Sequence, residues 1–317
     1  MTRSLSGETL SLMLDYLRQA NMGKIDGPEC GRLITAALSA RDAFVTPQGN
    51  PNHVAPFGDS SRDKSIDGES LARLNVMLPW SSYNILDGEE RILGSPWSGR
   101  KRMEPQMLPD VAIERLNRIL PLKGLEILEV GCFEGHHTAS LARYASELWA
   151  FDGRIENVIK TLVRLWVLGL EHAAKVEQID IEAGSVAEQL ARRGRSAKFD
   201  LVHHRGVLYH LSNPVEHLAD VSALCARHIY LHSQIATKEQ ANGTCRSALG
   251  EFDAFFYKEP RRSYSPFAGM TEKATWLTRE SLVKVLSDLG FADIRILKEV
   301  RERNGDRIEL IASRSKA

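Results

Sequence analysis

The chain has 317 residues, of which 43% are apolar and 26% are charged, as in ordinary soluble globular domains. Lysine plus arginine equal aspartate plus glutamate, 41 each, so the whole chain has no excess positive charge to attract nucleic acid, although a local basic patch could act alone. It contains no apolar run long enough to cross a membrane, and the polar N-terminus is unlike a signal peptide. With four scattered cysteines and no CxxC pair, we expect free thiols in a soluble cytoplasmic protein.

The first hundred residues predict helices and loops rather than a sheet. Apolar stripes and helix-start signals place helices at 6–20, 29–44 and 68–77, and a further helix at 109–120, beyond this region. A stretch rich in Pro, Gly, Asn and Ser, 46–67, is expected to be a long loop. We expect residues 1–104 to form a helical region that covers a site or supports a homodimer, and residues 105–317 to form the main domain.

From Leu125 onward, candidate strands and helices alternate regularly. The strands are expected at 126–130, 148–151, 175–179, 201–204 and 229–232, and the helices between them at 136–144, 154–168, 185–193 and 214–226. A last helix, 278–289, precedes two strands at 294–299 and 307–313, which Asn304-Gly305 joins as a hairpin. This order predicts an α/β fold with a parallel sheet and an antiparallel terminal pair.

A glycine-rich turn follows the first strand of this alternation, in the sequence LEILEVGCFEG from Leu125 to Gly135. Strand, glycine turn and helix together are typical of a nucleotide-cofactor crevice. The glycines let the backbone approach a ligand, and the free amides at the helix start favour a negatively charged group. Taken alone, the turn could also serve NAD, and the alternative is a tight connection without a ligand.

The parallel strands, the glycine turn and the terminal hairpin together resemble a class I S-adenosylmethionine (SAM) methyltransferase. The acid–x–Gly–x–x–x–Gly pattern of that superfamily is matched by Glu129, Gly131 and Gly135, whereas Phe133 stands where a further glycine is often found. The resemblance implies a Rossmann-like, seven-stranded sheet and places these residues beneath the methionine part of SAM. Cys132 would then be a small neighbour of the cofactor rather than a nucleophile.

Two further acids occupy cofactor positions of this superfamily. Asp152 ends the second strand about 20 residues after the glycine turn, where a carboxylate binds the ribose hydroxyls. Asp180, followed by Ile181, comes after the third strand, where the resemblance implies contact with adenine. The alternatives are a helix cap for Asp152 and ordinary turn chemistry for Asp180.

The segment from Phe199 to Leu218, FDLVHHRGVLYHLSNPVEHL, resembles the tRNA wobble-uridine carboxymethyltransferase family. The resemblance covers roughly 125–235 and returns around 276–300. That family transfers a carboxymethyl group from carboxy-SAM to tRNA, but related sequences also occur among small-molecule methyltransferases. The balanced charge and the divergent outer segments favour a small-molecule acceptor, with tRNA and carboxy-SAM as the alternative. A regulator that binds SAM without turnover is a third hypothesis, against which the intact Asp152 and GVLYH segment argue.

The end of the fourth strand is expected to supply the reacting side chains. His204, Arg205, Tyr209 and His210 follow one another there. The resemblance places Tyr209 near the transferred group. His204 and Arg205 are candidate cofactor contacts, because the strand ends at the crevice where cofactor and acceptor meet. Methyl transfer to a hydroxyl or ammonium needs a base, and histidine has a pKa near neutrality, so His210 is the first candidate and His204 the second. The alternative is that these histidines pack against adenosine or cap a helix.

Six of the ten histidines lie between His203 and His232, which raises the question of a metal site. His203 and His204 point to opposite faces of one strand, and no pair of histidines stands beside a carboxylate at a clear ligand spacing. The sequence therefore predicts no metal.

The segment 250–276 lies where this fold inserts acceptor-binding elements. It is dense in aromatic residues, which suits a flat or apolar acceptor and makes Tyr264 and Trp276 candidate contacts, with Glu251 for a cationic acceptor. We expect it to be a polar loop, and packing of its aromatic residues over the sheet edge is the equal alternative to acceptor binding. Local basic residues, at Arg100–Arg102 and Arg261–Arg262, would bind an anionic group or simply stay solvated.

Overall fold

The computed structural model describes residues 106–315 apart from 196, 260–266 and 303. Before residue 106 it describes 4–5, 12–13, 15–16, 19, 24, 29–30, 32–34, 44–45, 68–78, 80–81, 85–86 and 92–93. The predicted loop 46–67, the basic runs 100–102 and 261–262, and Tyr264 lie outside the described residues, so those predictions stay open.

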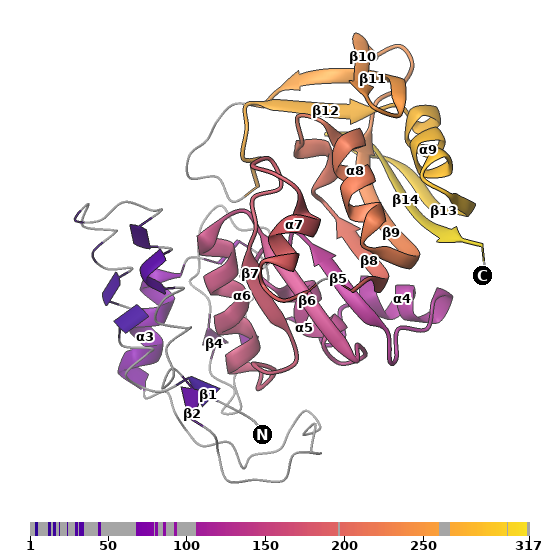
Figure 1. The fold of residues 1–317 in the computed structure, drawn as a ribbon. Helices are drawn as coiled ribbons and strands as arrows, with labels where there is room; N and C mark the ends of the chain where they lie inside the picture. Colours follow the sequence, from indigo (N-terminus) through magenta and orange to yellow (C-terminus); the bar gives the residue numbers. More distant parts are fainter. Residues whose placement is uncertain are drawn as a thin grey trace.

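A seven-stranded sheet forms the centre of the molecule, in the order β13-β14-β9-β8-β5-β6-β7 (Figure 1). Its strands are β5 (Glu126–Val130), β6 (Glu147–Asp152), β7 (Lys175–Gln178), β8 (Phe199–Arg205), β9 (Cys225–Ile235), β13 (Phe291–Glu302) and β14 (Gly305–Arg314). Strands β7, β6, β5, β8 and β9 are parallel, and β14 runs antiparallel to both β9 and β13. The predicted α/β sheet with its antiparallel hairpin is confirmed.

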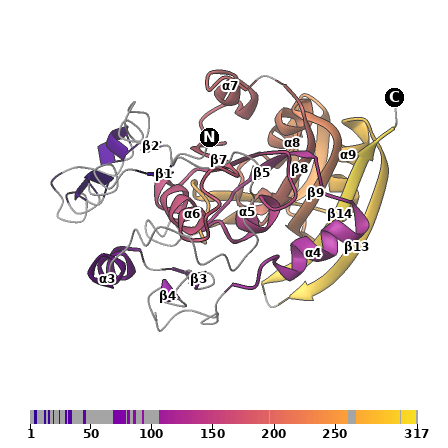
Figure 2. The same cartoon turned by 90° about the horizontal axis from the view of Figure 1, so that it is seen from below.

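Helices cover both faces of this sheet (Figures 1 and 2). One face carries α4 (Val111–Ile119), α5 (His136–Leu141) and α6 (Ile155–Val167); the other carries α7 (Val186–Ala191), α8 (Pro214–Ala223) and α9 (Arg279–Asp288). A short 3₁₀ turn, η1 (Leu208–His210), lies between β8 and α8. Alternate residues of each central strand face the two layers, because strand side chains point to opposite sides of a sheet.

The region between β9 and α9 differs from the expected polar loop. It contains a three-stranded antiparallel sheet of β10 (Gly243–Ser247), β11 (Gly250–Lys258) and β12 (Lys273–Leu277), which lies across one end of the main sheet (Figure 1). The loop prediction was wrong because polar and apolar residues alternate in the first half of β11, where Phe252 and Ala254 are buried and Glu251 and Asp253 are exposed. Such alternation is the pattern of a half-buried strand.

Part of the described N-terminal region packs against α6. This region includes α3 (Gly68–Met77), which confirms the predicted helix there, and two short pairs, β1 (Ser4–Leu5) with β2 (Phe44–Val45) and β3 (Ile85–Leu86) with β4 (Ile92–Leu93). Met13, Ile34, Leu74 and Trp80 share one buried cluster with α6 residues. No helix in the described part of the chain has both the length and the apolar character needed to cross a membrane.

Candidate active site

A cavity of about 1460 Å³ opens at the carboxyl ends of β5, β6, β7 and β8. Its wall also includes the residues before and at the start of α4, the end of β11, and part of the β13–β14 hairpin. Strand order reverses between β5 and β8, and ligands of open α/β sheets bind at such a switch point. The cavity therefore lies where the fold is expected to hold a cofactor and its reaction partner.

The predicted glycine turn forms part of the cavity wall through Gly131, Cys132 and Phe133. The amides of Gly131 and Cys132 both donate to the Phe151 carbonyl at 2.9 Å, which pins the turn to β6. Phe133 has a positive φ of 52°, and its ring lies 5.4 Å from that of Phe267. Burial raises the pKa of the Cys132 thiol well above its usual value, so this thiol stays protonated.

Gly131 is needed for two separate reasons, and replacing it tests both. Its φ is +74°, and a Cβ there would lie 2.1 Å from Cγ2 of Val207. We expect Gly131→Ala to lower the free energy of unfolding, measured by urea denaturation, by about 2–4 kcal/mol. Gly194→Ala is the matched control, because φ is +84° there and nothing lies within 4 Å of the added methyl group. Equal losses in the two variants would show that the contact with Val207 does not matter.

Asp152 ends β6 on the cavity wall, as predicted for a ribose ligand. Its Oδ2 accepts from the Phe133 amide at 3.0 Å, and its Oδ1 accepts from the Arg154 amide at 2.9 Å and from Asn157 Nδ2 at 3.0 Å. Burial raises the pKa of this carboxyl to about 6 despite these hydrogen bonds. Asp152 is thus ionised at neutral pH and held in a fixed orientation.

Glu129 ends β5 on the same wall and is 2% exposed. Burial raises its pKa to about 8, and its Oε2 has no hydrogen-bond partner among the described residues. A buried carboxyl oxygen without a partner costs free energy that a cationic ligand group would recover.

Gly135 and Asp180, two of the predicted cofactor residues, lie off this wall. Gly135 has φ +78° at the start of α5 and stands against Thr161. The Oδ1 of Asp180 accepts from the Glu182 amide at 2.9 Å, which is the turn chemistry that was its alternative. The wall here is formed instead by Ile179, Ile181 and Glu182.

The two adjacent histidines of β8 face opposite sides of the sheet. His203 lines the cavity, whereas His204 is buried against α8 with its Nε2 2.9 Å from His217 Nε2. Burial lowers the pKa of His204 to about 4. Because His204 does not reach the cavity, it has no access to an acceptor or a cofactor there. Arg205 does reach the cavity and donates to the Tyr230 hydroxyl at 2.7 Å.

His210 lies on the cavity wall beside a carboxylate that the sequence did not reveal. Its Nδ1 is 2.9 and 3.0 Å from the two carboxylate oxygens of Glu259, which follows β11. Both side chains are largely buried and both line the cavity. A carboxylate on Nδ1 fixes the tautomer of the ring and leaves Nε2 to accept a proton.

Tyr209 and Trp276 also stand on this wall, and Glu251 does not. Trp276 Nε1 donates to the Tyr209 carbonyl at 3.0 Å, and the Arg307 guanidinium lies 5.2 Å from the centre of the Tyr209 ring. Glu251 is exposed and pairs with Arg246 at 2.9 Å on the outer surface. Its position gives no support to the expected contact with an acceptor.

A second polar wall, which the sequence did not indicate, runs across β8, β9 and β14. Glu309 accepts from Arg115 at 2.5 and 2.6 Å and from the Tyr230 hydroxyl at 2.9 Å. Glu309 and Tyr230 satisfy each other inside the protein, and burial raises the pKa of Tyr230 to about 12. The alternation of β8 and β14 was visible in the sequence, but the pairing of Tyr230 with Glu309 depends on a register that only the structure provides.

The strand order, the antiparallel last strand and the cavity at the switch point define a Rossmann-like methyltransferase fold. The chain belongs to the methyltransferase domain family, which residues 103–296 match. This match confirms the predicted class, a SAM-dependent methyltransferase, and with it the predicted cofactor.

The relatives agree with this class without fixing an acceptor. The tRNA U34 carboxymethyltransferase of Saccharophagus degradans is 27% identical over 154 residues, which cover 48% of this chain and 41% of that protein. That of Haemophilus ducreyi is 28% identical over 157 residues, 48% of this chain and 42% of that protein. The chain thus spans less than half the length of these relatives.

Among solved structures, the N-terminal domain of EvdMO1, crystallised in the presence of SAH and D-fucose, is similar with a TM-score of 0.59. The two are 23% identical, over 80% of this chain and 100% of that chain. The same domain with SAH bound gives a TM-score of 0.59 at 22% identity, over 82% and 100%. These similarities establish the shared fold.

Proposed function

We propose that the protein transfers a methyl group from SAM to a small-molecule acceptor, with His210 as the base. SAM supplies a methyl group on a sulfonium sulfur, and the acceptor attacks it in line. The residues on the wall fit this cofactor: Asp152 would bind the ribose hydroxyls, and the buried, unpartnered Oε2 of Glu129 would meet the ammonium group of the methionine part. Gly131 and Cys132 would let the backbone approach that part closely.

The observation that carries the proposal is the pairing of His210 with Glu259 on the same wall as Asp152. Nε2 of His210 would accept the proton that the acceptor oxygen or nitrogen loses when it gains the methyl group and the bond between sulfur and methyl breaks. The Glu259 carboxylate stabilises the imidazolium that results. Tyr209 and Trp276 would hold the acceptor by its apolar parts.

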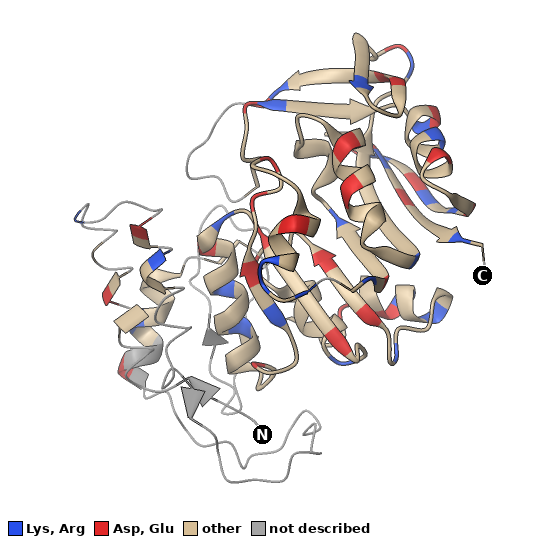
Figure 3. Cartoon of the chain, in the orientation of Figure 1, with Lys and Arg blue, Asp and Glu red and all other residues tan. Residues whose placement is uncertain are grey.

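The size of the cavity supports a small acceptor. At about 1460 Å³ it exceeds the roughly 300–1,000 Å³ of a typical small-molecule site, which leaves room for an acceptor beside the cofactor. The distribution of charge gives no similar support to an RNA acceptor. In the view of Figure 3, basic and acidic residues are interspersed over the described strands and helices. The N-terminal region, residues 1–104, would close one side, since Ser81 lines the cavity and its amide donates to Glu134.

A second candidate, transfer of a carboxymethyl group from carboxy-SAM to tRNA, has one structural point in its favour. Arg307 lies over the Tyr209 ring on the cavity wall, and a guanidinium beside the transferred group would bind the extra carboxylate. The named relatives are tRNA U34 carboxymethyltransferases, which supports the same candidate.

Binding measurements separate these candidates. Calorimetric titration with SAM, its demethylated product and carboxy-SAM is expected to show binding of SAM, and a preference for carboxy-SAM would favour the second candidate. Absence of binding to any of the three would overturn the proposed function. Gel shift with total tRNA at several salt concentrations is expected to show no specific complex.

The affinity for SAM should depend on pH through Asp152. Its raised pKa of about 6 means that the carboxylate, which accepts hydrogen bonds from ribose, predominates above pH 6. Affinity should therefore fall by up to about tenfold per pH unit below pH 6. Asp152→Asn should bind SAM roughly 10- to 100-fold more weakly at pH 7.5 and lose this dependence. Asp180→Asn is the control, because Asp180 lies off the wall, and a similar loss there would contradict the assignment.

A further inference from the structure

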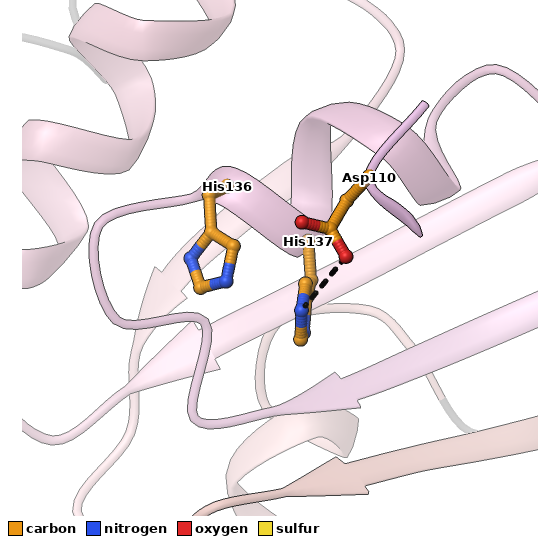
Figure 4. A group of neighbouring side chains, drawn as sticks. All are labelled: Asp110, His136 and His137. Atoms are coloured by element: carbon orange, nitrogen blue, oxygen red, sulfur yellow. Dashed lines mark ion pairs between the residues drawn. The ribbon is translucent and has the colours of Figure 1, made fainter. Parts of the chain in front are cut away.

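Three side chains with metal-binding chemistry stand together on the cavity wall. Asp110 precedes α4, and His136 and His137 begin α5; Figure 4 shows the three side chains near one another. One ligand atom from each lies within 4.8 Å of the other two, and Asp110 Oδ1 is 3.6 Å from His137 Nε2. Ligands about 2.0–2.2 Å from a tetrahedral ion lie roughly 3.4 Å apart, so small side-chain rotations would complete a site.

The contact between Asp110 and His137 does not by itself explain the arrangement. At 3.6 Å it is too long for a hydrogen bond. Asp110 Oδ1 caps α4 by accepting from the Ala112 amide at 2.8 Å, which leaves its Oδ2 and the cavity side of the carboxylate for another partner. Helix capping therefore accounts for one oxygen of Asp110.

Buried polar atoms next to His137 indicate that this wall is built around a polar ligand. His203, 1% exposed, lies edge-on to His137 at 5.4 Å between ring centres. Neither ring nitrogen of His203 has a hydrogen-bond partner among the described residues. Each such buried group costs free energy when nothing satisfies it.

We propose that Asp110, His136 and His137 bind one divalent transition-metal ion in the cavity. Two imidazoles and a carboxylate suit Zn²⁺, Co²⁺, Mn²⁺ or Fe²⁺ better than Mg²⁺ or Ca²⁺, which prefer oxygen ligands. Three protein ligands leave positions open toward the cavity. If the proposed function holds, these positions would take an acceptor with two adjacent oxygen atoms and lower the pKa of its hydroxyl group.

The sequence did not indicate this site, because its ligands come from two segments that are separate in the chain. The histidine cluster that is visible in the sequence lies elsewhere, between His203 and His232. Adjacent residues such as His136 and His137 do not usually share a helix face. Here they occupy the first turn of α5, from which both reach the cavity.

Titration of the metal-free protein with Co²⁺, followed by visible absorption and calorimetry, tests the proposal. We expect one Co²⁺ per chain, displaced by Zn²⁺ and not by Mg²⁺. Asp110→Asn, His136→Gln and His137→Gln should each weaken Co²⁺ binding at least tenfold. Asn still caps a helix, so the Asp110 variant keeps α4 intact. His172→Gln, beside Glu171 and away from the cavity wall, is the matched control and should leave Co²⁺ binding unchanged.

Three results would overturn the proposal. The first is no Co²⁺ binding to the wild-type protein, and the second is unchanged Co²⁺ binding in His137→Gln. The third is loss of Co²⁺ binding in His203→Gln but not in Asp110→Asn or His136→Gln. That result would place the ion on Glu129, His137 and His203, a second group that satisfies the same distance criterion. Titration of SAM into the same metal-free samples tests the proposed function separately, because the binding of SAM does not need the metal.

Discussion

Replacing His210 by alanine is expected to lower kcat for methyl transfer by about 10²–10⁴-fold while leaving the Kd for SAM unchanged. The reason is its position on the cavity wall with Nδ1 held by Glu259. Loss of the imidazole removes the proton acceptor, whereas the proposed ligands of SAM, Glu129 and Asp152, are untouched. The measurement is the rate of formation of demethylated SAM with saturating acceptor, beside calorimetric binding of SAM.

Glu259→Gln tests the role of the Glu259 carboxylate separately from that of the His210 imidazole. The amide still reaches His210 but carries no charge to stabilise the imidazolium, so kcat should fall less than in His210→Ala. His228→Ala is the matched control, because His228 lies on β9 and bonds Ser313 away from the cavity. A wild-type rate in His210→Ala with intact SAM binding would remove His210 as the base.

The positions of Gly131 and Asp152 on the cavity wall could be predicted because local signals determine them. Gly131 follows β5 and Asp152 ends β6, two strands whose apolar runs are visible in the sequence, and parallel strands bring their carboxyl ends to one edge. His203 and His204 differ by one residue, and the alternation of strand side chains predicted that they face opposite sides. What alternation does not reveal is which side holds the cavity, so the choice of His204 over His203 had no physical basis in the sequence.

The partner of His210 could not be predicted for a different reason. Glu259 lies far along the chain, beyond β10 and β11, and reaches His210 only because β12 packs against η1 and carries that small sheet to the cavity. Acids with a local sequence signal, such as Glu251, lie on the outer surface instead. Contacts between distant segments depend on strand register, and a single sequence does not specify register where a segment reads as a loop.

The largest loss of stability is expected from Glu134→Ala. Glu134 follows Phe133 in the glycine turn, is fully buried, and pairs with Lys160 of α6 at 2.9 Å. Its carboxylate also accepts from the Ser81 amide at 2.7 and 3.0 Å, which ties the N-terminal region to the turn. Removing one member of a buried ion pair leaves the other charge in a poor environment, which costs about 3–5 kcal/mol.

Urea denaturation measures this loss, and two further variants identify its cause. Glu134→Gln keeps acceptors for Lys160 and Ser81 but removes the charge, so it should lose less than Glu134→Ala. Glu188→Ala breaks an exposed pair with Arg192 at 3.9 Å and should cost at most about 0.5 kcal/mol. Hydrogen exchange at the Ser81 amide should become faster in Glu134→Ala alone. A loss no larger than that of Glu188→Ala would show that the turn holds its shape without this pair and that the N-terminal region is anchored by the apolar cluster on α6.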